Sequence, residues 1–411
     1  MSESDRRTFM VQSVGAMAAV ALLPEHGLAA TLAGADEVPV ALIGAGRQGR
    51  AILAELQKID QVRIAAVCDV VQSRLRSGLR RARGAKGYAD SRQLLERERD
   101  LGAVFIATPT HLHRQIAADA LGAGLHVYCE APLASTVQDA RAIVAAARES
   151  GKILQPGLLA RSNPIYRLAR SFFRSDAIRR AVSIHAQHHR KTTWRTPAAD
   201  PRDESALNWR LDPARSIGLT GEWGTHQFDV AHWFLGRYPE RVTGGGSIRL
   251  HDDGRTVPDT IHCDLHFADG LRMGYDATLA NSFDSRFEMF YGSNATIKLA
   301  GNAGWMFKEA DAPTQGWEVY ASTERFHNED GITLIADATK LAKQGKLKEG
   351  IGLPNPPLYY GIVDFLKAAF EQGPIVCSPE EGLRSAAVGI AANRAIVSGE
   401  PVEIAPLLNQ E

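Results

Sequence analysis

The sequence predicts an α/β protein with two domains, a doubly wound parallel sheet followed by an α/β domain with a large, open, mostly antiparallel sheet. From residue 36 to about residue 155, short apolar runs alternate with segments of helical length, which is typical of a parallel sheet covered on both faces. After residue 156 the apolar runs follow one another and are separated by hairpin turns such as Ala268-Asp269-Gly270. A chain of 411 residues is long enough for two such domains.

Residues 1–35 are not part of this predicted fold. Ser4–Met10 reads SDRRTFM, a twin-arginine pattern, and an apolar run from Val11 to Leu23 follows it. Ala33-Gly34-Ala35 offers the small residues that a signal peptidase prefers, and the apolar run is shorter than the roughly 20 residues of a membrane helix. We therefore expect an export signal and a periplasmic or otherwise exported mature protein with no membrane segment.

The first domain, residues 36–155, is expected to contain five strands with helices between them. The strands are Val38–Ile43, Val62–Cys68, Val104–Ala107, His126–Cys129 and Ile153–Gln155, and the clearest helices are Leu112–Ala123 and Thr136–Ser150.

The second domain, residues 156–400, is expected to begin with a helix over Asn163–Ser175. It is expected to end with closing helices near residues 359–398, which span Tyr359–Gln372 and Pro379–Ser398. Its predicted strands are Ala181–Gln187, Arg241–Leu250, Thr260–Phe267, Leu271–Leu279, Phe287–Tyr291 and Thr296–Leu299. Gly301–Pro357 has no regular pattern and is expected to be irregular.

The turn after the first strand carries a dinucleotide-binding pattern. Gly44-Ala45-Gly46-Arg47-Gln48-Gly49 places glycines at the three positions of G-x-G-x-x-G, and an amphipathic segment, Ala51–Ile59, follows. The first glycine permits a tight turn, the second lets a pyrophosphate approach the backbone, and the third lets helix and strand pack closely. Asp69 ends the next strand and can accept hydrogen bonds from the ribose hydroxyls of NAD. Arg74 and Arg76 nearby leave NADP as the less favoured cofactor.

Ligands of doubly wound sheets bind beyond the carboxyl ends of the strands. In this chain those positions hold Gly44–Gly49, Asp69, Thr108-Pro109-Thr110-His111 and Glu130-Ala131-Pro132. We therefore expect the cofactor to contact residues of these segments.

Composition excludes some classes of partner and site. The 47 acidic and 47 basic residues balance, so no net field favours nucleic acid. The four cysteines are far apart and form no C-x-x-C pair, so we expect neither a disulfide framework nor a metal site.

Together these motifs identify a resemblance to the glucose–fructose oxidoreductase/inositol dehydrogenase (Gfo/Idh/MocA) family, from about residue 38 to residue 400. Its marks are Gly44–Gly49, Asp69, Ala107–His113, Val127–Leu133 and Gly221–Asp229. The resemblance implies a Rossmann domain, a second domain whose sheet packs against another subunit in a dimer or tetramer, and hydride transfer between NAD(P) and a sugar or polyol.

The resemblance also implies roles for individual residues. Glu222 matches the family's common acidic residue and His226 its catalytic histidine, which would accept the proton of the reacting hydroxyl. Asp229 is expected either on the helix surface or beside the site. The implied cofactor contacts are Gly44, Gly46, Arg47, Gln48, Gly49, Asp69, Thr108, Pro109, His111, His113 and Glu130.

One position departs from the family pattern. The family usually has Glu-Lys-Pro after the fifth strand, whereas this chain has Glu130-Ala131-Pro132, and alanine is neither an acid nor a base. A basic residue from elsewhere must fill this place, or the usual dehydrogenase scheme does not apply. The candidates are His185, His188, His189, Arg190 and Lys191, with Arg161 and Tyr166 near the domain junction.

Aromatic residues near these motifs suggest a carbohydrate pocket, because sugar C–H faces stack on aromatic rings. Trp194 and Trp209 lie in polar surroundings, so with Arg161, Tyr166 and His188 they are the predicted substrate contacts. The sequence thus predicts an exported oxidoreductase that holds its NAD tightly, since free nucleotide is scarce outside the cytoplasm. The alternatives are a redox-cycling glycoside hydrolase, which oxidises the sugar transiently and releases the aglycone, and a non-catalytic sugar or nucleotide sensor.

Overall fold

The computed structural model describes residues 37–314, 318, 321–326, 329–336, 341 and 352–409. The predicted export signal, residues 1–35, lies outside these residues. No helix in the described part of the chain is long and apolar enough to cross a membrane.

The first domain is a parallel sheet, as the α/β pattern predicted, and it has six strands where five were expected. Their order is β3-β2-β1-β4-β5-β6. Its strands are β1 (Val38–Ile43), β2 (Val62–Cys68), β3 (Lys86–Tyr88), β4 (Ala103–Ile106), β5 (His126–Cys129) and β6 (Leu154–Pro156). Its helices are α2 (Arg47–Leu56), α3 (Gln72–Arg81), α4 (Ser91–Arg97), α5 (His113–Gly122) and α6 (Val137–Ser150). The strand order reverses beside β1, which is where ligands of such sheets bind.

Local chemistry explains where the helices begin and end. Thr136 caps α6 by accepting a hydrogen bond from the Asp139 amide at 3.0 Å, and Gly151 ends the helix at φ 63°. Ser378 and Glu381 form a capping box at the start of α12 (Pro379–Ser398), which has its predicted bounds.

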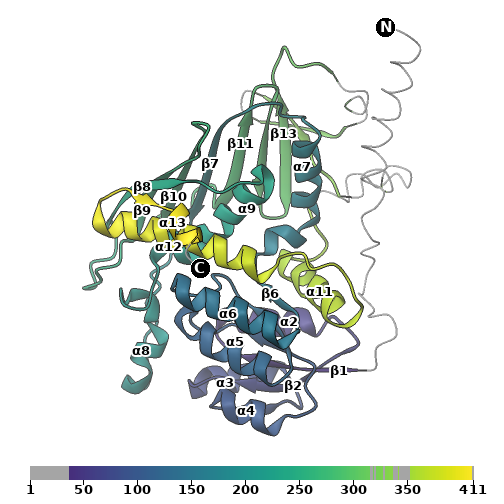
Figure 1. The fold of residues 1–411 in the computed structure, drawn as a ribbon, viewed down its shortest axis with the longest axis vertical. Helices are drawn as coiled ribbons and strands as arrows, with labels where there is room; N and C mark the ends of the chain where they lie inside the picture. The colour runs from purple at the N-terminus through teal and green to yellow at the C-terminus, as the bar shows by residue number, and fades with distance from the viewer. Residues whose placement is uncertain are drawn as a thin grey trace.

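The second domain contains a sheet of ten strands in the order β14-β15-β13-β12-β11-β7-β10-β9-β8-β16. The pairs are antiparallel except for β7 with β10, so the sheet is mostly antiparallel, as predicted. Its longer strands are β7 (Ala181–His189), β8 (Arg241–Ser247), β9 (Thr260–His266), β10 (Arg272–Thr278), β11 (Arg286–Gly292) and β12 (Ala295–Ala300). Helices α7 (Pro164–Arg174) and α9 (Thr225–Leu235) cover one face, and α12 joins them in the same apolar core (Figure 1).

The segment 301–357 is more regular than predicted where the structure describes it. It contains β13 (Ala303–Lys308), β14 (Thr323–Arg325) and β15 (Asp330–Thr333), which extend the second sheet at one edge, while β16 (Val402–Glu403) pairs at the other. The expectation of an irregular segment was therefore wrong for these residues. β14 and β15 are short and have few apolar residues, and the apolar residues of β13 are consecutive and do not alternate, so none of the three gives a periodic signal.

The closing helices connect the two domains. Helix α11 (Pro357–Phe370) packs into the apolar core of the first domain, where Phe365 contacts Phe105 and Tyr128, although it follows the second sheet in the chain. Helix α12 then runs between the two sheets, with the first domain below it in Figure 1 and the second domain above it. The first domain therefore includes a helix from near the C-terminus, which the predicted boundary assigned to the second domain.

Candidate active site

The three positions of the β1–α2 turn require glycine for different physical reasons. Gly44 has φ 100°, and a Cβ there would lie 2.6 Å from the Ala107 carbonyl carbon. A Cβ on Gly49 would lie 1.8 Å from the Gly44 oxygen, so helix and turn pack too closely for a side chain. A Cβ on Gly46 would meet only the Arg74 guanidinium, at 4.0 Å. Protein packing therefore explains the glycines at positions 44 and 49. Gly46 instead leaves the backbone open to a ligand, as pyrophosphate binding requires.

Asp69 lies at the end of β2 beside this turn. Its Oδ2 accepts a hydrogen bond from the Ala45 amide and its Oδ1 accepts one from the Val71 amide, both at 2.8 Å. Burial raises the pKa of this carboxyl, although both hydrogen bonds oppose that shift. Each oxygen has a second lone pair, so Asp69 is held in place and can still accept hydrogen bonds from ribose hydroxyls.

Glu130 follows β5 and approaches the turn from the other side. Gln48 Nε2 donates a hydrogen bond to its Oε1 at 2.9 Å. Burial raises the pKa of Glu130 to about 7. The predicted cofactor residues Gln48 and Glu130 are therefore in contact, and Ala131 next to them is half-buried.

The chain after β4 contains two histidines with different environments, His111 in the connection and His113 at the start of α5. His113 is buried, and its nitrogens lie 3.0 Å from the carbonyl oxygens of Pro132 and Thr108. The structure thus places His113 beneath the loop, where it holds backbone and offers no atom to a nucleotide. His111 is half-buried with its Nδ1 enclosed and unpartnered, and Thr108 Oγ1 is likewise unpartnered. Buried polar atoms without a partner are uncommon, so both atoms suit contacts with a ligand. Pro109, half-buried between them, shapes the turn.

Glu222 joins the two domains. Thr110 Oγ1 of the first domain lies 3.2 Å from both carboxylate oxygens of Glu222, and Arg210 Nε lies 3.5 Å from Oε2. Burial raises the pKa of Glu222, opposed by Arg210 and by the hydrogen bond from Thr110. Glu222 is part of a π-helical turn, Thr220–Gly224, that leads directly into α9. The turn places the carboxylate beside the carboxyl ends of the parallel strands, and we call the region between them the crevice.

His226, in the first turn of α9, lies near two other groups that the structure brings together. Burial lowers the pKa of His226 to about 4, and the positive charge of Arg286 adds to this shift. His188 of β7 stacks on Trp223, with ring centroids 4.0 Å apart and planes at 16°. The neutral form of His226 is therefore favoured, as a proton acceptor requires.

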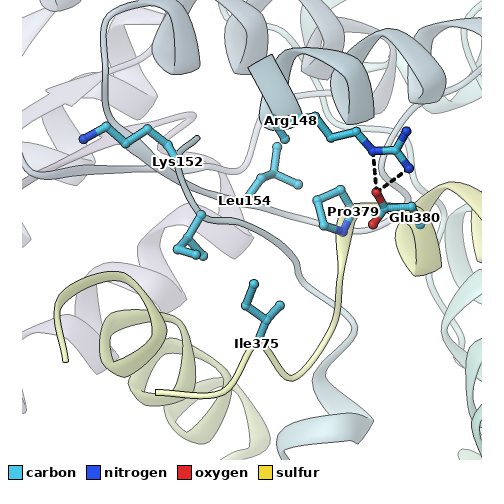
Figure 2. A pocket seen from close by; sticks show the side chains of 8 residues that line it. Arg148, Lys152, Leu154, Ile375, Pro379 and Glu380 are labelled. Atoms are coloured by element: carbon cyan, nitrogen blue, oxygen red, sulfur yellow. Dashed lines mark hydrogen bonds and ion pairs between the residues drawn. The ribbon is translucent and has the colours of Figure 1, made fainter. Parts of the chain in front are cut away.

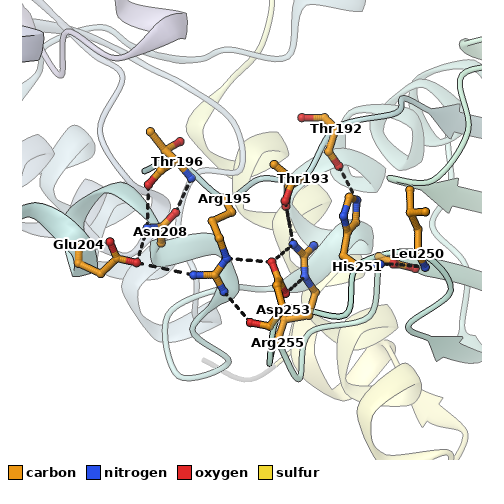
Figure 3. Close-up of polar contacts among 11 residues, drawn as sticks. Thr192, Thr193, Arg195, Thr196, Glu204, Asn208, Leu250, His251, Asp253 and Arg255 are labelled. Atoms are coloured by element: carbon orange, nitrogen blue, oxygen red, sulfur yellow. Dashed lines mark hydrogen bonds and ion pairs between the residues drawn. The ribbon is translucent and has the colours of Figure 1, made fainter. Parts of the chain in front are cut away.

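An arm, defined as residues 190–216, closes one side of this crevice. Arg195 Nε donates to Asp253 Oδ2 at 2.8 Å, and Arg255 Nη2 donates to the Thr193 oxygen at 2.8 Å (Figure 3). These contacts tie the arm to the loop after β8. Farther along the arm, Trp209 lies with its ring centroid 5.8 Å from that of His111 in the first domain.

Positive charge gathers where the arm meets the glycine turn. Arg210 lies over the rings of Trp209 and Trp194, at 4.3 and 5.8 Å. Partial burial lowers the pKa of Arg47, and Arg190 and Arg210 lower it further because all three carry like charge. The turn and the arm thus present guanidinium groups to one region, which suits the anionic pyrophosphate of a dinucleotide.

Two predicted substrate contacts need correction. Arg161 donates to both carboxylate oxygens of Asp229, at 2.8 and 2.9 Å, and also pairs with Glu381. Tyr166 is 2 % exposed, and its hydroxyl donates to Glu288 at 2.5 Å. Because carboxylates already occupy the polar atoms of both side chains, we assign them a structural role. Substrate contacts of the half-buried Trp194 and His188 and of the buried Trp209 stay predictions.

Sequence reasoning did not single out Arg210 or Arg286. Arg210 shows no local pattern, and only the pairing of β11 with β7 places Arg286 opposite His188. Asp229, for which two placements were open, is buried against Arg161, as the hydrogen bonds above describe.

A separate cavity lies away from these residues. It has a volume of about 160 Å³ and is bounded by α6, β6 and the segment before α12, with the Arg148–Glu380 ion pair at its edge (Figure 2). None of the predicted site residues lines it, so we place the site in the crevice instead. Within the described residues, no group of three or more His, Cys, Asp or Glu side chains is arranged to hold a metal ion.

Comparison with known proteins identifies the family of both domains. The profile of an oxidoreductase family with an NAD-binding Rossmann fold matches residues 38–158, and the profile of the GFO/IDH/MocA C-terminal domain matches residues 166–298. An uncharacterized oxidoreductase of Bacillus subtilis, YrbE, is 24 % identical over 371 residues, which cover 90 % of this chain and 97 % of that protein. Levoglucosan dehydrogenase of Pseudarthrobacter phenanthrenivorans is 32 % identical over 211 residues, or 46 % of this chain and 52 % of that enzyme.

Solved structures share the fold. A levoglucosan dehydrogenase in complex with NADH and levoglucosan has a TM-score of 0.70 and 21 % identity, covering 89 % of this chain and 99 % of that one. An oxidoreductase domain protein of Kribbella flavida has a TM-score of 0.71 and 22 % identity, covering 90 % and 100 %.

Proposed function

Because this chain belongs to the Gfo/Idh/MocA family of NAD-binding oxidoreductases, we propose that it transfers hydride to or from a sugar, polyol or glycoside and holds its NAD tightly. The observation that carries the proposal is the contact of Thr110, in the first domain, with Glu222, which lies one helical turn before His226. Thr110 follows β4, whose carboxyl end lies at the same edge of the parallel sheet as the segments that hold Gly46 and Asp69. Inositol and levoglucosan dehydrogenases among the relatives support a carbohydrate substrate.

The residues of the crevice fit a dinucleotide. Gly46 and Arg47 would face the pyrophosphate, Asp69 the adenosine ribose, and Glu130 with Gln48 the nicotinamide half. NAD is preferred over NADP because the carboxylate of Asp69 repels a 2′-phosphate. A bound NAD supplies the acceptor for a hydride.

In the oxidation of a secondary alcohol, the protein must take the proton of the hydroxyl. His226 accepts this proton as the O–H bond breaks, the carbinol C–H bond gives up its hydride, and the carbonyl forms. Glu222 is held by Thr110 and Arg210, so it orients the substrate and stays in one position. Trp194 supplies an aromatic wall for the sugar.

A second function, a redox-neutral glycoside hydrolase, is favoured by Ala131. Ala131 stands where the usual dehydrogenase has a lysine beside the reacting hydroxyl, so a different reaction scheme is open to this site. Such a hydrolase, with tightly bound NAD, would oxidise the sugar, eliminate the aglycone, add water and return the hydride. Net oxidation and net hydrolysis are therefore the two outcomes to separate.

One experiment separates them. The mature protein is purified without added nucleotide, its bound NAD(H) is recorded by absorbance, and it is incubated with a sugar panel and with nitrophenyl glycosides. We expect bound NADH to accumulate with one sugar and to be discharged by a second carbonyl compound. Aglycone release without NADH accumulation would indicate the hydrolase instead. Bound nucleotide that responds neither to the sugars nor to the nitrophenyl glycosides would contradict both enzymatic functions and favour a sensor.

Location and assembly complete the proposal. The twin-arginine pattern at Ser4–Met10 supports export, and fractionation of cells that express the full chain tests it. The face of the second sheet that bears His185, His262 and Asp276 is half-exposed to exposed, which supports a homodimer or homotetramer through this face. Light scattering on the purified protein measures the assembly directly.

A further inference from the structure

The side of β7 on which a residue lies decides which basic residue can replace the missing lysine. His188 shares its side of the strand with the buried Ala186, and it lies opposite Ala277 of β10 and Arg286 of β11. His185 and His189 point to the other side, because successive strand residues alternate. His185 lies 3.8 Å from Asp276 on that far face. Of the three histidines, only His188 lies on the side of α9 and the crevice.

The surroundings of His188 connect it to the catalytic segment. Its ring stacks on Trp223, which lies between Glu222 and His226 in the chain. Trp194 makes a T-shaped contact with the same Trp223 ring, with centroids 5.4 Å apart and planes at 85°. The imidazole is therefore fixed in orientation within the wall that carries both predicted catalytic residues.

One ring nitrogen of His188 is not satisfied by the protein. Nδ1 is buried and has no hydrogen-bond partner. Burial lowers the pKa of His188 far below its ordinary value, and Arg286 and His226 lower it further. A neutral imidazole has one donor and one acceptor nitrogen, so it can donate a hydrogen bond to a hydroxyl or carbonyl oxygen without carrying charge.

We propose that His188 and His226 together bind the reacting oxygen of the substrate. His188 thereby takes the role of the family's lysine, which is replaced by Ala131 in this chain. The proposal rests on the proposed oxidoreductase function. His226 accepts the proton, and His188 donates a hydrogen bond that holds the oxygen as the carbonyl forms. A neutral donor replaces a cation, so the site stabilises the oxygen without adding another charge beside Arg286.

The test compares the two sides of the strand. His188→Phe keeps a ring on Trp223 and removes both nitrogens, and His185→Phe is the matched control on the far face. Both proteins are purified with their bound nucleotide, and the rate of its reduction by the active sugar is measured, with nucleotide content and melting temperature as structural controls. We expect H188F to slow reduction at least about tenfold with nucleotide retained, because one hydrogen bond is lost, and H185F to stay within about twofold of the parent.

The double variant A131K/H188F tests the replacement itself. A lysine at position 131 should restore at least part of the lost rate if it occupies the place that His188 fills. A rate for H188F within about twofold of the parent, or no gain from the lysine, would overturn the role of His188 while the oxidoreductase function stands. A parent protein whose nucleotide no sugar reduces would overturn both.

Discussion

At the scale of single residues, the proposed proton transfer depends on a histidine that burial keeps neutral. The pKa of His226 falls to about 4, so the imidazole can accept a proton over the whole range in which it would otherwise titrate. It is only half-buried, and so a substrate can reach it.

His226→Ala tests this residue. We expect turnover to fall by at least about 100-fold, since general base catalysis contributes at least that much, while bound nucleotide is retained. Single-turnover reduction of the bound NAD measures the effect, and nucleotide content after gel filtration is the control. Unchanged turnover would remove His226 from the mechanism.

Glu130 gives a prediction about pH. Its pKa is about 7 in the folded protein against an ordinary 4.5, so between these values the folded state holds a proton that the unfolded state has released. The contribution of Glu130 to stability is therefore greatest below pH 4.5 and is lost as pH rises through 7. Glu130→Gln removes this penalty and should raise the free energy of unfolding by about 2 kcal/mol at pH 8, with no gain at pH 4. Urea titration at both pH values measures it, and an equal gain at both would contradict the assignment.

At the scale of elements, substitutions in the glycine turn should distinguish residues needed for packing from residues needed for nucleotide binding. Gly49→Ala should destabilise the protein, because the new Cβ would overlap the Gly44 oxygen, whereas Gly46→Ala meets no backbone atom and should fold normally. We expect G46A instead to lose nucleotide during purification. Melting temperature and nucleotide content measure the two effects, and the reverse pattern would exclude a pyrophosphate at Gly46.

The elements also mark how much the sequence could predict. The strands β1, β2 and β5 and the helix α12 have their predicted bounds, because apolar runs and capping residues define them locally. β3 was missed, since three residues at a sheet edge give no periodic signal.

The placement of Arg161 and Tyr166 could not be predicted either. Their partner carboxylates, Asp229 and Glu288, are 68 and 122 residues away in the chain. Such pairings follow from the packing of whole elements and leave no local pattern in the sequence. The same holds for Arg286, which strand pairing alone brings opposite His188.

At the scale of the whole molecule, a buried ion network connects the domain junction to α9 and α12. Arg161, which follows β6, contacts Asp229 of α9 and Glu381 of α12, and Ser385 donates to Asp229 at 2.9 Å. This network lies directly behind the helix that carries His226, so the relative position of the two domains and the catalytic geometry depend on the same contacts.

Arg161→Met should therefore destabilise the protein by about 3–5 kcal/mol, since it leaves a buried carboxylate without its partner. Arg148→Met is the matched control, because its pair with Glu380 is exposed and should contribute less than about 1 kcal/mol. Chemical denaturation measures both variants. Equal effects would mean that the buried network does not hold the molecule together.

The central claim is that the crevice between Gly44–Gly49 and Asp69 binds NAD. Calorimetric titration of nucleotide-stripped protein with NAD and with NADP, on the parent and on Asp69→Ala, tests it most directly. We expect the parent to bind NAD at least about tenfold more tightly than NADP, and D69A to lose this preference, because the carboxylate accepts hydrogen bonds from the ribose hydroxyls and repels a 2′-phosphate. A parent that binds neither nucleotide, or a preference for NAD that D69A leaves unchanged, would contradict it.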